Sequence, residues 1–122
     1  MKISTIELLG KQYPMCFSLT AAAEMDEAFG GLETLSEQLT SNRIGMVART
    51  VNTALEILLK AGRTYAALNG MEVPDPLPCA PADLIDIRDG KAVKAILSAI
   101  SGDTEREVET EVPNGEAAQS PA

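Results

Sequence analysis

The sequence predicts a mainly α fold: a small helical domain that begins with a β-hairpin and ends in a disordered acidic tail. Apolar residues alternate with polar ones over the first 19 residues and then recur at helical spacing, which indicates strands followed by helices. Hydrophobic residues make up 45% of the 122 residues but aromatic residues only 3%. Such an aliphatic interior suits packed helices better than a sandwich of sheets. We therefore expect one helical domain over residues 1–102 and a tail over 103–122.

Residues 1–19 carry the hairpin pattern. One side of the alternation holds six apolar residues, namely Ile6, Leu8, Tyr13, Met15, Phe17 and Leu19. Gly10-Lys11 interrupts the alternation and predicts a tight turn between two short strands. Leu9 stands where Asn or Asp would favour the positive φ angles of a two-residue loop, so the pattern leaves the strand register open.

Residues 20–69 have the spacing of helices. A first helix is predicted from Thr20 to Gly30-Gly31, because Gly commonly caps the C-terminus of a helix. One face of a second short helix holds three leucines, namely Leu32, Leu35 and Leu39. A polar break at 40–42 then provides a cap for the next helix.

A long central helix is predicted from Arg43 to about Leu68. Its main apolar stripe is formed by Ile44, Val47, Ala48, Val51, Leu55, Leu58, Gly62 and Tyr65. The opposite side collects Arg49, Asn52, Thr53, Glu56, Lys60 and Arg63. Glu56 and Lys60 lie one helical turn apart on this side, so we expect them to form an ion pair.

The apolar surface of the central helix is wider than this stripe. Five further residues extend it around one shoulder, namely Met46, Ala54, Ile57, Ala61 and Leu68. A single neighbour cannot cover so broad a face. Either the helix lies in the middle of the domain with helices on two sides, which we prefer, or the shoulder is presented to another protein chain. In the second case these five residues bind the partner, and Ile57→Asp would abolish binding without loss of the fold.

Prolines mark the end of the central region. Residues 70–81 form a semi-rigid connector, since Pro lacks the backbone donor and disfavours helix in the residue before it. Residues 82–102 are expected to hold the C-terminal helices. A short helix is predicted to begin at Pro81 and run through Ile87, and an amphipathic helix of about three turns is predicted to end at Gly102. The pattern leaves open whether the segment after Pro78 packs on the domain or detaches as a mobile arm.

The acidic residues are concentrated at the C-terminal end. Residues 103–122 contain six acids and one base, Arg106, and so carry −5 of the chain's net charge of −8. Their only large apolar residues are Val108 and Val112, which cannot offset the entropy of ordering the segment. We expect a solubilising tail, with an acidic ligand for a basic partner as the alternative. The net charge also argues against nucleic acid as a partner.

The sequence contains little that suggests catalysis. It has no histidine, the commonest general base and metal ligand. Glu24 and Glu27 are best explained as a charged solvent face, and Gly30-Gly31 lacks the following residues of a phosphate-binding loop. Cys16 and Cys79 have no metal-ligand spacing, and the basic cluster around Lys91, which includes Arg88 and Lys94, is expected to balance local charge. We therefore expect a binding protein with no cofactor and no metal, and not an enzyme.

No segment has the pattern of a signal peptide or a membrane span. We accordingly expect the protein to stay in the cytoplasm and to have no membrane partner.

Two stretches carry a resemblance to a known family. They are Gly10-Lys11-Gln12-Tyr13-Pro14-Met15-Cys16-Phe17-Ser18-Leu19-Thr20 and Phe29-Gly30-Gly31-Leu32-Glu33. A Gly-Lys turn, a Tyr-x-apolar-x-Phe strand and a helix that ends in Phe-Gly resemble the tail assembly chaperones of long-tailed, siphovirus-like bacteriophages. The resemblance is good over the first third of the chain, extends through the central helix and is weak beyond Pro74.

The resemblance implies a function in virion morphogenesis. Such chaperones bind the long, mostly helical tape measure protein, keep it soluble and help tail tube subunits polymerise around it. They act in the host cell cytoplasm and are absent from the mature virion, and many of their genes encode a longer form through a programmed ribosomal frameshift. Self-association of the present chain stays open. The alternative function is that of a structural minor tail or head–tail joining protein of a phage particle.

Overall fold

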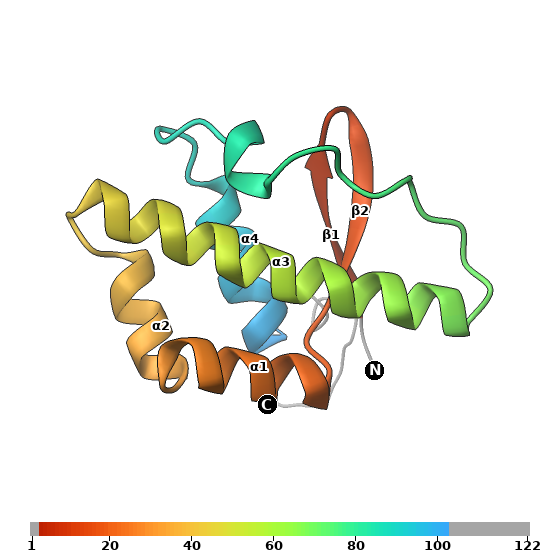
Figure 1. Ribbon diagram of the computed structural model, residues 1–122, viewed down its shortest axis with the longest axis horizontal. Coiled ribbons are helices and arrows are strands. Elements are labelled where there is room, and N and C mark those ends of the chain that lie inside the picture. Colours follow the sequence, from red (N-terminus) through yellow and green to blue (C-terminus); the bar gives the residue numbers. More distant parts are fainter. Residues whose placement is uncertain (1–2, 103–122) are drawn as a thin grey trace, which may run out of the picture.

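A single long helix organises the fold (Figure 1). The computed structural model describes residues 3–102, so the predicted tail at 103–122 lies outside the described residues. Strands β1 (Ile3–Leu8) and β2 (Lys11–Cys16) are followed by helices α1 (Leu19–Phe29), α2 (Leu32–Leu39) and α3 (Ile44–Leu68). A 3₁₀ turn, η1 (Pro81–Leu84), and helix α4 (Lys91–Ser101) complete the described chain. The predicted mainly α fold with an N-terminal hairpin is confirmed.

The hairpin is an antiparallel pair in which Leu8 faces Lys11 and Ile6 faces Tyr13. Leu9 and Gly10 form the two-residue loop with φ angles of 55° and 74°. Both angles are positive, as in the type I′ turns that match the twist of two paired strands. The sequence pattern had left this register open.

The inner face of the hairpin carries four of the six apolar residues predicted for it, and these four are buried: Ile6, Leu8, Tyr13 and Met15. The prediction is wrong for Leu19, which is 87% exposed because it is already the first residue of α1. Phe17 is half-buried and packs against the core. Strand β2 therefore ends at Cys16, before the last two apolar residues of the predicted pattern, Phe17 and Leu19.

Local signals set the ends of the first helix. The Ser18 side chain accepts a hydrogen bond of 3.1 Å from the backbone N–H of Ala21, which is the usual role of Ser at an N-cap. Gly30 ends α1 in the left-handed conformation at φ 81°, where Gly has no steric penalty. In α2, Leu35 and Leu39 are buried, whereas Leu32 is 45% exposed.

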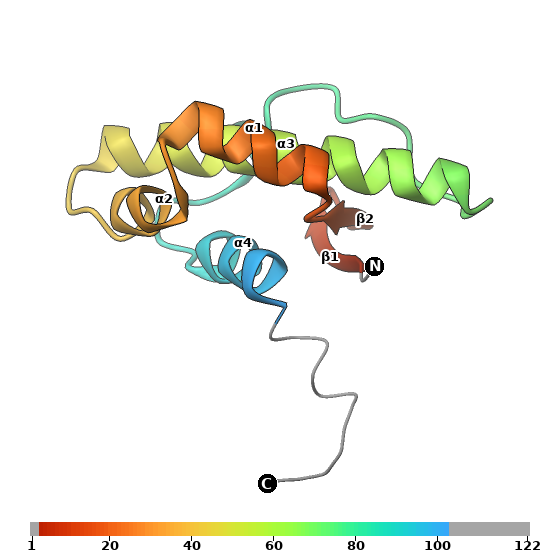
Figure 2. The ribbon, with the colours of Figure 1, turned by 90° about the horizontal axis from the view of Figure 1, so that it is seen from below.

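Helix α3 contacts β2, α1, α2, η1 and α4. Figure 2, a view from below, shows α1 running beside it and α4 lying on a different side. The prediction that the central helix lies between neighbours is confirmed, and its broad apolar face is covered from several directions. The predicted ion pair between Glu56 and Lys60 is wrong, because Lys60 reaches across to Glu24 of α1, with 2.9 Å between its Nζ and Glu24 Oε2.

Gly62 allows α3 to cross β2 at close range. A Cβ atom at this position would collide with the backbone carbonyl of Pro14 and would lie 2.8 Å from the amide nitrogen of Met15. Only a residue without a side chain fits there, so the contact between helix and strand depends on glycine.

One hydrogen bond holds the connector to α3, and a second holds η1 to α3. Arg63 Nη2 donates a hydrogen bond of 2.6 Å to the Pro74 carbonyl, and Asn52 Oδ1 accepts one of 2.9 Å from the N–H of Ala82. After the connector, only the 3₁₀ turn η1 forms where a helix through Ile87 was predicted, so that prediction is wrong. Helix α4 ends at Ser101, and Gly102 caps it in the left-handed conformation at the predicted end of the helix.

Helix α4 packs on the domain and is not a detached arm. Ala92 is 4% exposed and Ile96 is fully buried, and both belong to the core cluster that includes residues of the hairpin and of α3. The C-terminal region thus adds to the same hydrophobic core as the N-terminal hairpin.

Candidate protein-binding groove

A groove lies between the first turns of α1 and the C-terminal half of α3, and we call it the α1–α3 groove. Its volume is about 330 Å³. It is lined by Ser18, Thr20, Ala21, Glu24, Ile57, Lys60, Ala61, Thr64, Tyr65 and Leu68. Helical spacing explains why Ile57, Ala61 and Leu68 follow one another along it, since residues three or four positions apart share a face of a helix.

The charges in this groove are paired. Lys60 from α3 and Glu24 from α1 form the ion pair that bridges the two walls, and their side chains are 66% and 30% exposed. Exposed pairs of this kind contribute at most about 1 kcal/mol to stability. The pair links α1 to α3, and the other residues that line the groove carry no charge.

The five residues that the sequence analysis proposed for partner binding differ in their exposure and in whether they line the groove. Ala54 is fully buried and Ile57 is only 8% exposed, so the expectation that they present a free surface is wrong. Both belong to the hydrophobic core, which the neighbouring elements cover. Ile57 nevertheless forms part of the groove lining, as do Ala61 and Leu68. Met46 is half-buried and is not part of the lining.

Two leucines stand out beside the groove. Leu19 is 87% exposed and Leu68 is 81% exposed, the highest values among the large apolar side chains of residues 3–102. Leu68 lines the groove, and Leu19 lies between Ser18 and Thr20, which also line it. The sequence singled out Leu68 but missed Leu19, because the strand pattern assigned Leu19 to the inner face of the hairpin.

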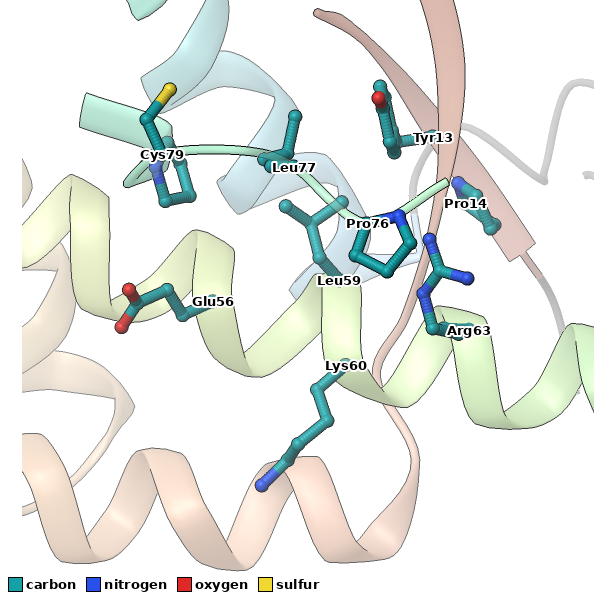
Figure 3. Close-up of a pocket in the computed structure, with 10 residues that line it drawn as sticks. Tyr13, Pro14, Glu56, Leu59, Lys60, Arg63, Pro76, Leu77 and Cys79 are labelled. Atoms are coloured by element: carbon teal, nitrogen blue, oxygen red, sulfur yellow. The ribbon is translucent and has the colours of Figure 1, made fainter. Parts of the chain in front are cut away.

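A second groove, of about 320 Å³, lies where the connector passes α3 and the hairpin (Figure 3). Tyr13 from β2, Leu59 from α3 and Leu77 from the connector all line it. In Figure 3, Lys60 points away from the connector toward α1, whereas Arg63 points toward the connector. The walls of this groove come from three segments that are far apart in the sequence, so no local pattern predicts it.

Two cysteines, Cys16 and Cys79, and the ion pair of Arg88 with Asp86 lie outside the α1–α3 groove. Among residues 3–102, no three His, Cys, Asp or Glu side chains are placed to hold a metal ion together. Burial raises the pKa of the Cys16 thiol, which disfavours the reactive thiolate, and the Cys79 side chain is exposed. Arg88 binds Asp86 through its guanidinium at 2.8 Å and holds the pKa of that carboxyl below its usual value. This pair fits the predicted role of the basic cluster in local charge balance.

In the part of the chain that the structure describes, no helix combines the length and the apolar character needed to cross a membrane. Comparison of the chain with protein families, curated proteins and solved structures finds no match.

Proposed function

We propose that this protein is a tail assembly chaperone of a long-tailed bacteriophage. In this role it binds the tape measure protein in the host cell cytoplasm, keeps it soluble and promotes polymerisation of tail tube protein around it. It acts by binding and not by catalysis, and it is absent from the mature virion. The motif residues that carry the family resemblance form the hairpin turn, β2 and the two ends of α1.

The α1–α3 groove is the observation that carries this proposal. It is an apolar trough beside two exposed leucines, Leu19 and Leu68, at one end of the central helix. Grooves of this kind accept the apolar face of an amphipathic helix, and the implied client is mostly helical. The chain's net charge of −8 favours solubility of the complex once the client's apolar surface is covered.

Co-expression of this protein with the tape measure protein of the same phage tests the proposal. We expect Leu19→Asp and Leu68→Asp to lower the amount of tape measure protein that stays soluble and co-purifies. Both residues are exposed, so the circular dichroism spectrum and the melting temperature of the variants should stay close to those of the wild type. Ile57→Asp is unsuitable for this test, because a charge at this buried position would destabilise the fold.

Ile44→Asp is the matched control. Ile44 is 67% exposed and lies at the other end of α3, outside the α1–α3 groove. This variant should retain the client. Equal loss in all three variants would show that general exposed hydrophobicity and not the groove holds the client. Stoichiometric copies of the protein in purified virions would overturn the chaperone proposal in favour of a structural tail protein.

A further inference from the structure

The two edges of the hairpin differ in what covers them. At the β2 edge, Pro14 has no N–H to donate, and α3 passes so close at Gly62 that no side chain fits between them. Figure 1 shows β1 on the other side of the hairpin, toward η1 and α4. Only the β1 edge is therefore left to pair with a further strand.

The register shows which backbone groups β1 offers at this edge. In an antiparallel pair, residues that exchange hydrogen bonds alternate with residues that do not. The pair Leu8–Lys11 closes the two-residue turn and is of the first kind. Thr5, opposite Pro14, and Glu7, opposite Gln12, are then of the second kind, so their N–H and C=O groups point away from β2.

A groove of about 440 Å³ runs along this edge. Thr5 and Glu7 line one side of it, and Leu84 and Ile85, from the end of η1 and the residue after it, line the other. Ala92 and Ala95 of α4 also line the groove. Open strand edges bind extended peptides through main-chain hydrogen bonds, and pockets for alternate side chains give specificity.

We propose that this groove binds an extended peptide of another protein, which adds to β1 as a third strand. The peptide's side chains on the face toward Ala92 and Ala95 are small and apolar. On the other face they are Lys or Arg, because the two acids in the groove lining, Glu7 and Asp89, outnumber the single base, Lys91. The inference concerns a different surface from the α1–α3 groove and does not depend on the proposed function.

The test uses a fluorescently labelled peptide of eight alternating valine and lysine residues, with binding measured by fluorescence anisotropy. Thr5→Pro removes the outward N–H that the added strand needs. It leaves the hairpin ladder intact, because the Thr5 N–H is not used there and its partner is itself a proline. We expect this variant to bind the peptide about tenfold or more weakly than the wild type.

Thr5→Val is the matched control, since it keeps the N–H and a β-branched side chain and should bind like the wild type. Glu7→Lys should also weaken binding, and the loss should diminish at high salt. A peptide that is N-methylated at every second residue has no N–H donors along one of its two edges. It should not bind to β1 through that edge.

Amide hydrogen exchange of the wild type provides a measurement that does not depend on the folding of Thr5→Pro. If the peptide adds to β1, it should slow hydrogen exchange of the Thr5 and Glu7 amides. Equal affinity of Thr5→Val and Thr5→Pro, or unchanged exchange at both amides with saturating peptide, would overturn it. A dimer of the protein alone that Thr5→Pro dissociates, with no peptide binding, would overturn it in favour of contact between two copies.

Discussion

At the scale of single residues, Leu9 is the position with the clearest conformational cost. It is the only residue other than glycine with a positive φ among residues 3–102, at 55°. Its side chain is 55% exposed, so burial offsets little of that cost. Left-handed backbone in an L-residue costs roughly 1–2 kcal/mol, and Asn tolerates it better than Leu. The sequence predicted a tight turn at Gly10-Lys11, whereas the loop is formed by Leu9 and Gly10 and Lys11 already belongs to β2. It did not predict that Leu9 adopts this conformation.

Leu9→Asn should therefore stabilise the protein by about 1 kcal/mol, because Asn reduces the cost of the left-handed backbone. The midpoint of urea-induced unfolding, followed by circular dichroism, measures the change. Leu9→Ala is the control, since it removes the exposed leucine side chain but keeps a residue that disfavours positive φ. If Ala and Asn raised the midpoint equally, the gain would come from the lost apolar surface and not from the backbone.

At the scale of elements, the crossing of α3 over β2 depends on Gly62. A glycine in a helix usually weakens it, by about 1 kcal/mol relative to alanine. Here the sequence placed Gly62 on the apolar stripe of the central helix without a reason for its small size. The reason is the backbone of Pro14, which belongs to a strand far away in the sequence. Two helix C-termini, in contrast, were predicted well, because Gly30 and Gly102 act through local backbone conformation.

Two alanine substitutions in the same helix should have opposite effects. Gly62→Ala should destabilise the protein by about 1–3 kcal/mol, since its methyl group forces α3 away from β2. Gly45→Ala should stabilise it by about 0.5–1 kcal/mol through helix propensity. A methyl group at Gly45 would meet only the end of the flexible Arg49 side chain, at 3.4 Å. Free energies of unfolding from urea titrations would check both values, and a neutral Gly62→Ala would show that the crossing can relax.

At the scale of the whole molecule, the contacts between distant segments were the part that the sequence could not supply. Lys60 pairs with Glu24, 36 positions away, and not with Glu56 in the next turn. The broad face of α3 correctly indicated several neighbours. It could not show which of its residues those neighbours cover, so Ala54 and Ile57 were grouped with the exposed Leu68. The packing of α4, which the sequence left undecided, also depends on such contacts.

Because α4 shares the core with the hairpin, it should unfold together with the rest of the domain. Ile96→Ala removes most of a fully buried side chain and should cost about 2–4 kcal/mol. Amide exchange should then accelerate in β1 and α3 as well as in α4, since the core is shared. Lys94→Ala, at an exposed position of the same helix, should change little. Faster exchange confined to α4 would contradict this prediction and would revive the detached arm.

The position of α3 in the chain has a consequence for synthesis on the ribosome. The hairpin, α1 and α2 are all translated before α3, yet each of β2, α1 and α2 packs against it. A nascent chain that stops short of Leu68 therefore exposes the apolar faces of β2, α1 and α2, because the complete α3 that covers them has not yet been made. We expect ribosome-bound chains of that length to attract the general chaperones of the cell, and release from them to follow the emergence of the long helix.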